Sequence, residues 1–305
     1  MSFLTNRKPI EKSTVLLAGP VRNVGAIIEQ EALLLRDCLS SFKEVHTLII
    51  ESDSEDATVA VLEKLKHTEQ NFDFVSLGKL SNTLRKRTER IARARNEVIQ
   101  QVRSNPKYST VDYIVMADMD GMNPLLTSQK INQCWMVDED WDVITANQVE
   151  AYYDVWTLRQ ADWCDVDCWA QKDRLQGLIG EPAAINLAIT ARQSALSPSL
   201  GMIEVDSAFG GLGIYKRNAF LAGQYAGLDA KGNEVSDHVP FHKQLREQNF
   251  HIYINSALIN CAKYPESIEP SAPPPLKKGL KLVQKLGHLV LGKQRFNNYL
   301  KRLSS

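Results

Sequence analysis

The chain has 305 residues, of which 44% are hydrophobic and 24% are charged, and this composition is typical of a globular protein long enough to bury a sizeable core. Its 36 basic residues balance 36 acidic residues, so no overall positive charge favours nucleic acid as a partner. These values exclude collagen-like, disordered and multi-span membrane proteins, and they leave an enzyme or a binding domain.

The start of the chain and its cysteines predict a cytoplasmic protein. The first 13 residues lack the apolar core of a signal peptide, and no run of 18 apolar residues occurs in the sequence. The five cysteines are an odd number and are thinly spread, which is not the pattern of a disulfide framework. Cys164 and Cys168 form the only close pair, and no second pair with zinc-binding spacing accompanies them.

Strands and helices alternate in the first 117 residues. Apolar runs predict strands at 15–19, 45–50, 72–77 and 113–117, and helical periodicity predicts helices at 26–42, 57–66 and 87–102. Strands separated by helices form a parallel sheet with helices on both faces, and ligands of such sheets bind beyond the carboxyl ends of the strands. We therefore predict an α/β fold of the nucleotide-binding type, although the two commonest glycine-rich phosphate motifs do not occur.

The strand predicted at 113–117 ends in two carboxylates, Asp118 and Asp120. Because the backbone turns where a strand ends, both carboxylates can lie near one hard cation, and Mg²⁺ and Mn²⁺ prefer oxygen ligands that include substrate phosphates. Two aspartates one residue apart also occur by chance in solvated loops. Their place after a buried strand, in a sheet whose other strand ends are polar, favours a metal site.

An acidic segment, residues 51–56, follows the second predicted strand directly. Its carboxylates, including Glu51 and Asp53, can accept hydrogen bonds from a base or a ribose. The alternative role is structural, because Ser54 or Asp53 is a suitable N-cap for the next helix. A cap needs one such residue whereas four acids follow this strand, so we favour contact with a ligand.

Arg95 lies on the apolar face of the helix predicted at 87–102, four residues after Ile91 and three before Val98. A buried guanidinium must be paired, and the acids at the strand ends or a ligand diphosphate are its candidate partners. The other arginines of this region are predicted to lie on a solvated face, where one or two can steer an anionic substrate. They are Arg85, Arg87, Arg90 and Arg93.

Four segments resemble, in this order, motifs of glycosyltransferases of the GT-A fold. They are GPVRN (19–23), IIESDSEDAT (49–58), ARARN (92–96) and DYIVMADMD (112–120). The resemblance covers residues 14–261, and it implies a mixed, mainly parallel sheet flanked by helices and the transfer of a hexose from a UDP- or GDP-hexose. It also implies Mn²⁺ or Mg²⁺ held by Asp118 and Asp120. The donor-binding residues that it implies are Pro20, Arg22, Asn23, Glu51, Asp53, Arg95 and Asp118.

The second half of the chain contains the residues predicted to face the acceptor and the sugar. Residues 152–159 resemble a segment of fungal capsule-type α-1,3-mannosyltransferases, and their Tyr153 and Trp156 either stack on a sugar ring or pack in the core. A strand predicted at 202–206 is followed by Gly210 and Gly211. These glycines either permit a tight loop beside a ligand or form an ordinary turn.

Many GT-A enzymes carry a late acidic residue, which is the general base in the members that invert anomeric configuration. By this resemblance Asp237 is the candidate base, and Asp206 is the competing candidate. His238 is predicted to contact the acceptor or the sugar. Its alternatives are a metal ligand and a structural histidine at the start of a helix.

The neutral total charge hides a basic C-terminal segment. Residues 271–305 contain six Lys and two Arg and no acid, a net charge of +8. We predict a GT-A domain at 1–265, with a donor half at 1–125 and an acceptor half at 126–265. A Pro-rich linker and a basic amphipathic tail follow at 266–305. Residues 277–302 are predicted to bind an anionic membrane surface at its inner face, and the alternative is a helix packed on its own domain.

The sequence thus favours a metal-dependent glycosyltransferase of polysaccharide biosynthesis, with a hydroxyl of a glycan or a lipid-linked glycan as acceptor and no nucleic-acid partner. One alternative is a haloacid-dehalogenase-type phosphatase, in which Asp118 would be the nucleophile and Asp120 the acid and base. That family carries its motif near the start of its core domain, whereas about 110 residues precede the motif here. The other alternative is a non-catalytic scaffold that binds sugar nucleotides at a membrane.

Overall fold

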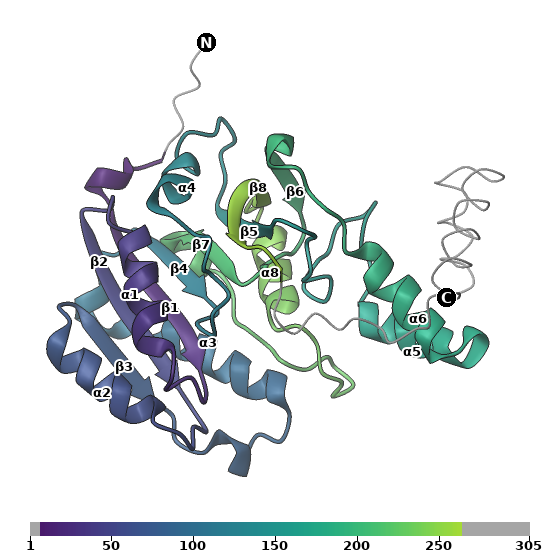
Figure 1. Ribbon diagram of the computed structural model, residues 1–305, viewed down its shortest axis with the longest axis horizontal. Helices are drawn as coiled ribbons and strands as arrows, with labels where there is room; N and C mark the ends of the chain where they lie inside the picture. Colours follow the sequence, from purple (N-terminus) through teal and green to yellow (C-terminus); the bar gives the residue numbers. More distant parts are fainter. Residues whose placement is uncertain (1–6, 264–305) are drawn as a thin grey trace.

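A single eight-stranded sheet organises residues 7–263, the part of this computed structural model that is described. Its strands lie in the order β3-β2-β1-β4-β7-β5-β8-β6 (Figure 1). In chain order they are β1 (Thr14–Val21), β2 (Glu44–Glu51), β3 (Phe72–Ser76), β4 (Tyr113–Ala117), β5 (Val143–Gln148), β6 (Met202–Val205), β7 (Leu212–Lys216) and β8 (Ile252–Cys261).

The sheet is mixed and mainly parallel, as predicted. The first four strands pair in parallel, and β5 pairs in parallel with β8. β7 lies between β4 and β5 and runs antiparallel to both, and β6 is antiparallel to β8 at the edge. Because β7 runs in the opposite direction, it begins where β4 ends, and the loop before it meets the loop after β4.

The helices cover both faces of the sheet. They are α1 (Ile28–Cys38), α2 (Thr58–Thr68), α3 (Arg87–Ser104), α4 (Ser128–Gln133), α5 (Cys168–Ile179), α6 (Glu181–Ala188), α7 (Arg217–Leu221) and α8 (His238–Glu247). Successive side chains of a strand point to opposite faces, so Leu16 packs in the core cluster that includes α3 and α8, while Leu17 packs in the cluster that includes α1, α2 and α4.

The extent of the first helix and the cap of the second differ from what the sequence led us to expect. The first helix occupies 28–38 and not 26–42, because residues 24–27 form a turn and Leu39 ends the helix. The alternative role of the acidic segment, with Ser54 or Asp53 as N-cap of the second helix, is wrong, since Ala57 precedes α2 and makes no side-chain cap. Asp56 serves that end of the helix instead, and its Oδ1 accepts the backbone N–H of Thr58 at 3.0 Å.

A close approach between β1 and β4 brings their carboxyl ends together. A Cβ atom at Gly19 would lie 2.2 Å from the carbonyl oxygen of Ala117, a distance that no side chain can occupy. Glycine at this position therefore lets the end of β1, which includes Pro20 and is followed by Arg22, lie beside the start of the Asp118 loop.

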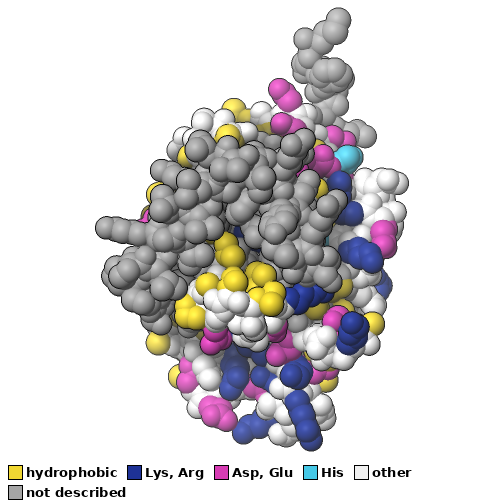
Figure 2. All heavy atoms as spheres, turned by 90° about the vertical axis from the view of Figure 1, so that its right-hand side faces the viewer, with side chains coloured by type: hydrophobic (Ala, Val, Ile, Leu, Met, Phe, Trp, Pro, Cys, Tyr) yellow, Lys and Arg dark blue, Asp and Glu magenta, His cyan; other side chains and the backbone are white. Residues whose placement is uncertain are grey.

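The helices α5 and α6 form a hairpin that projects from the body of the protein beyond α8 (Figure 1). Figure 2 views the side on which this hairpin lies, and hydrophobic side chains gather in the middle of that face. The exposed apolar side chains of α5 and the loop before it are Val166, Leu178 and Ile179. Within residues 7–263, no helix has the length and apolar character needed to cross a membrane. The linker and basic tail predicted at 266–305 lie outside the described residues.

Candidate active site

A cavity of about 520 Å³ lies beyond the carboxyl ends of β1, β2 and β4, where ligands of such sheets bind. One side of its wall comes from these strand ends and from α3. The other comes from residues 153–157, the start of α5 and the start of α8. Ten of the predicted site residues line it, namely Pro20, Arg22, Asp53, Arg95, Asp118, Asp120, Tyr153, Trp156, Asp237 and His238.

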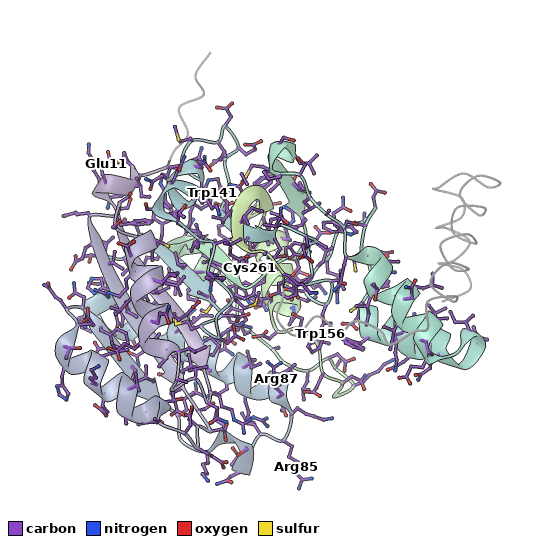
Figure 3. All side chains as sticks on the ribbon, viewed as in Figure 1. Glu11, Arg85, Arg87, Trp141, Trp156 and Cys261 are labelled. Carbon is purple, nitrogen blue, oxygen red and sulfur yellow. The ribbon has the colours of Figure 1, made fainter. Side chains whose placement is uncertain are left out.

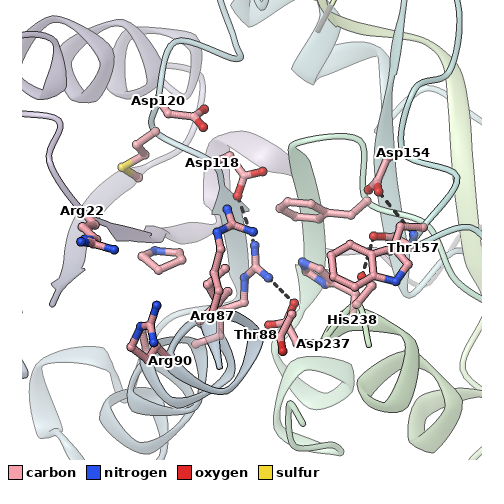
Figure 4. Close-up of a pocket in the computed structure, with 18 of the residues that line it drawn as sticks. Arg22, Arg87, Thr88, Arg90, Asp118, Asp120, Asp154, Thr157, Asp237 and His238 are labelled. Carbon is pink, nitrogen blue, oxygen red and sulfur yellow. Dashed lines mark hydrogen bonds and ion pairs between the residues drawn. The ribbon is translucent and has the colours of Figure 1, made fainter. Parts of the chain in front are cut away.

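Arg95 links the two sides of the cavity. Its side chain is buried, as its helical position predicts, and it donates to Asp237 Oδ1 at 2.6 Å and to Asp118 Oδ1 at 3.1 Å (Figure 4). Burial alone would lower the pKa of the guanidinium, but the two carboxylates outweigh burial and raise the pKa. Arg95 therefore holds a fixed positive charge between β4 and α8.

Asp118 and Asp120 follow β4 at the cavity wall. Burial raises the pKa of Asp118 to about 7; Arg95 opposes this rise, while Asp120 and other acids add to it. Such an excess of carboxylates is the environment that a divalent cation stabilises. No group of three or more His, Cys, Asp or Glu side chains among residues 7–263 is arranged to hold a metal alone. Two aspartates fit Mn²⁺ or Mg²⁺ when substrate oxygens and water complete the coordination.

Basic side chains gather at the end of the cavity that lies away from residues 153–157 and α8. Arg22, Arg87 and Arg90 line the cavity, and Figure 4 shows Arg22 and Arg90 on the side away from Asp154 and His238, with Arg87 reaching towards Asp118. The prediction that Arg90 lies on a solvated face is wrong. Its side chain is only 15% exposed, and its Nε lies 3.8 Å from Asp53 Oδ2. Arg85 does extend into solvent (Figure 3).

Asp53 is held rigidly at the end of β2. Its backbone adopts φ 61°, and its Oδ1 accepts the backbone N–H of Ser81 at 2.9 Å. Burial would raise the pKa of this carboxyl, but the hydrogen bonds from Ser81 and the charge of Arg90 lower it. Asp53 is therefore a charged group at the cationic end of the cavity.

Asp154 is a cavity residue that the sequence did not reveal. Its Oδ2 accepts the backbone N–H of Gly210 at 3.1 Å, and its Oδ1 accepts that of Thr157 at 3.3 Å. Burial raises the pKa of its carboxyl. The signal in the sequence is an acid between Tyr153 and Trp156, two aromatic residues that were themselves predicted to stack on a sugar or to pack in the core. Other cavity residues missed include Ser52, Thr157, Trp169, Gln193, Phe209 and Ser236.

Five predicted site residues do not line the cavity, and each has a structural contact instead. Glu51 is buried and accepts the N–H of Ser54 at 2.9 Å, and Asn23 Oδ1 accepts the N–H of Glu55 at 2.8 Å. Both contacts shape the turn of the acidic segment. Asp206, the competing base, has a side chain that is 62% exposed and pairs with Arg246 at 3.3 Å outside the cavity.

Gly210 and Gly211, the other two, form a tight loop behind the wall. Both have a positive φ, of 66° and 87°, in which glycine is the favoured residue. A Cβ atom at Gly210 would meet the carbonyl oxygen of Ala146 at 2.8 Å. Their role is therefore to let the loop before β7 pass close to β5 and present the Gly210 N–H to Asp154.

Two histidines of α8 are buried in the wall and beneath it. His238 and His242 are 2% and 0% exposed. Burial lowers the pKa of both, to about 3 for His242, and the positive charge of Arg95 lowers both further. Both rings are neutral in the folded protein at neutral pH.

We expect the free energy of unfolding to fall as the pH drops below about 6.5, because the unfolded chain then protonates His242 and the folded chain does not. The contribution is about 1.4 kcal/mol per pH unit for one proton. Urea titrations between about pH 7 and 5 give the slope of the free energy of unfolding against pH. This slope should be shallower for His242→Gln than for the wild type, by the equivalent of about one proton. His67→Gln changes an exposed histidine of α2 and should leave the slope of the wild type. Equal slopes in all three proteins would contradict the burial of a neutral His242.

No family model matches the chain, and no curated protein matches it. Among solved structures, it is similar to mannosyltransferase PcManGT from Pyrobaculum calidifontis in complex with GDP-Man and Mn²⁺. That likeness has a TM-score of 0.50 at 14% identity and covers 97% of this chain and 74% of that chain. It shows the fold, so the predicted GT-A fold is confirmed.

Two further structures match less well. S. aureus TarS 1–349 in complex with UDP-GlcNAc has a TM-score of 0.45 at 12% identity, with 95% of this chain and 71% of that chain covered. Glucosyl-3-phosphoglycerate synthase from Mycobacterium tuberculosis in complex with UDP has a TM-score of 0.41 at 12% identity, with 96% and 80% covered.

Proposed function

We propose that this protein transfers a hexose from a UDP- or GDP-hexose to a hydroxyl of a glycan or a lipid-linked glycan. The observation that carries the proposal is the composition of one cavity in a GT-A fold. A strand-end pair of carboxylates, Asp118 and Asp120, lies between a cationic end and an end rich in aromatic and acidic side chains. The anionic diphosphate of a nucleoside diphosphate sugar would lie between the cationic end and a metal at Asp118 and Asp120, and its uncharged sugar would lie at the aromatic and acidic end.

The cationic end is suited to the nucleotide. Arg22, Arg87 and Arg90 can bind phosphate oxygens, and Asp53 can accept a hydrogen bond from a ribose or a base. Arg22 is oriented for this role, since its Nε donates to the carbonyl oxygen of Asp53 at 3.2 Å.

Asp118 and Asp120 are the residues that would hold Mn²⁺ or Mg²⁺. When bound there, the cation neutralises negative charge on a departing diphosphate. Arg95 adds a fixed positive charge on the same wall and orients Asp118 through its Nη2. These groups favour cleavage of the sugar–phosphate bond.

The opposite end is suited to sugars. Tyr153 and Trp156 offer aromatic surfaces, and Asp154 and Asp237 offer oxygens to hydroxyl groups. Asp237 is the proposed general base. Arg95 binds its Oδ1, while its buried Oδ2 has no hydrogen-bond partner within residues 7–263 and can accept the proton of the acceptor hydroxyl.

A thermal-shift panel tests the proposal with UDP, GDP and their hexose derivatives, each with and without Mn²⁺. A ligand that binds only the folded state at a hundredfold excess over its Kd adds about 2.7 kcal/mol of stability. We expect a rise in Tm that needs both Mn²⁺ and one of the two nucleotides. If a folded sample shows no shift with any nucleotide, the proposal is wrong, and phosphatase and scaffold functions become the better explanations.

A further inference from the structure

A chain of buried hydrogen bonds runs beneath the cavity and ends in its wall. Ser207 Oγ lies 3.0 Å from His242 Nδ1, and His242 Nε2 lies 3.1 Å from the hydroxyl of Tyr215. That hydroxyl lies 3.5 Å from His238 Nδ1. All four side chains are at most 2% exposed. We call this chain of four side chains the histidine relay.

The far end of the relay faces the cavity. His238 lines it, and the ring is stacked on Phe209 with centroids 4.0 Å apart. His238 Nε2 is buried and has no hydrogen-bond partner in the described part of the chain. An unpaired buried polar atom costs free energy, so a binding partner from a ligand is expected at this atom.

The direction of the hydrogen bonds follows from counting donors. A neutral imidazole has one N–H, so the relay can run in two directions. If Ser207 donates to His242 Nδ1, then His242 Nε2–H donates to Tyr215 and Tyr215 donates to His238 Nδ1. Among the donors of these four side chains, His238 Nε2–H is then the one left without an acceptor. The Tyr225 hydroxyl also interacts with that of Tyr215. In the reverse direction, His242 Nδ1–H donates to Ser207 Oγ, and the buried Ser207 hydroxyl proton has no acceptor among residues 7–263. His238 Nε2 is unpaired in that direction too, as an acceptor without a donor. The first direction therefore costs one unpaired group fewer.

The neutral state of both rings is part of this argument. Burial and the nearby charge of Arg95 lower the pKa of both histidines, so neither carries a second N–H at neutral pH. Tyr215 keeps its proton because burial raises the pKa of its hydroxyl. The relay thus holds one proton between each pair of groups.

We propose that the histidine relay holds His238 as the Nε2–H tautomer, and that this N–H donates a hydrogen bond to a hydroxyl oxygen of the transferred hexose. The assignment to the hexose rests on the proposed function. It follows from the position of His238 at the end of the cavity that carries Asp154, Thr157 and Asp237, away from Arg22 and Arg90 (Figure 4). His238 would then be a residue that distinguishes the sugar nucleotide from the free nucleotide.

The tautomer is tested without any ligand. In the full-length protein labelled with ¹⁵N-histidine, long-range ¹H–¹⁵N spectra at neutral pH report which ring nitrogen carries the proton. We expect Nε2–H for both His238 and His242, with assignments from His238→Gln and His242→Gln. Tyr215→Phe keeps the ring and removes the link, so His238 should become a mixture of tautomers. A pure Nδ1–H form of His238 in the wild type, or no effect of Tyr215→Phe, would overturn the relay.

The sugar contact is tested by calorimetry with Mn²⁺ and four probes: UDP, UDP-N-acetylglucosamine, GDP and GDP-mannose. His238→Phe fills the space of the ring and lacks a donor, while His238→Gln keeps an N–H near the position of Nε2. For whichever nucleotide binds the wild type, we expect His238→Phe to weaken the sugar nucleotide about tenfold and to leave the free nucleotide within about twofold. His238→Gln should recover most of the loss.

Equal weakening of both ligands, or no weakening of either, would overturn the sugar contact. If the wild type binds none of the four probes, the proposed function fails and the sugar contact fails with it. The tautomer measurement is independent of that outcome, so the two failures are distinguishable.

Discussion

Asp120→Asn is expected to lower the proposed hexose transfer by about 10³-fold while leaving the fold intact. Asp120 lies in the exposed turn after β4, so the amide should not change packing. It removes a charged oxygen ligand, and Mn²⁺ would bind the diphosphate less tightly. The measurement is the initial rate of transfer as a function of Mn²⁺ concentration, and we expect the half-saturating concentration to rise as well.

Asp138→Asn is the matched control for this experiment. Asp138 is also an exposed aspartate in a loop, but it does not line the cavity. We expect it to keep the rate and the Mn²⁺ dependence of the wild type. Full transfer activity with unchanged Mn²⁺ dependence in Asp120→Asn would show that the strand-end carboxylates hold no catalytic metal.

Arg95→Met should lower the free energy of unfolding by about 3–5 kcal/mol, because it removes one partner of a buried ion pair. Asp237 would lose its Nη1 contact, and its side chain is only 7% exposed. Asp118 contributes less, since its side chain is 31% exposed and water can replace the lost contact. Urea unfolding at neutral pH measures the difference, which is a large part of the stability of an ordinary domain.

Two variants of α3 control for loss of charge and loss of packing. Arg93→Met, two residues earlier, removes an exposed arginine that pairs with Glu97 and should cost at most about 0.5 kcal/mol. Arg95→Lys keeps the charge but cannot donate from a planar fork to two carboxylates, so an intermediate loss is expected. If Arg95→Met and Arg93→Met cost the same, the ion pairs of Arg95 do not stabilise the fold.

The first half of the fold could be predicted because its signals are local. Four apolar runs became β1 to β4. The run of β4 is continuous because every residue of that strand is buried, whereas β3 is an edge strand in which only Phe72 is buried. The strands β5, β7 and β8 were not predicted. Their pairing joins residues far apart in the chain, such as Met116 with Gly213 and Val143 with Ile252, and no local pattern encodes that register.

The same distinction applies to the cavity. Arg95 was predicted to be buried because helical spacing places it between two apolar residues. Arg90 was misassigned, since its burial depends on Asp53, which reaches it from the end of β2. Glu51 and Asn23 were predicted from their chemical type, but backbone N–H groups of the acidic segment and the Ser76 hydroxyl already occupy their side-chain oxygens, and neither residue lines the cavity. A sequence shows which polar groups are present and not which of them are already satisfied.

The chain between β5 and β6 leaves the sheet at Gln148 and returns to it at Met202, with only β8 between these two strands. Both points are tied to the same strand, because Gln148 lies opposite Cys261 of β8 and Met202 lies opposite Asn255 of β8. This one continuous segment of the chain contributes Tyr153, Asp154, Trp156 and Trp169 to the cavity. A recombination event that exchanged it would replace most of one wall and leave every strand in place, so new specificity could be inherited as a single block.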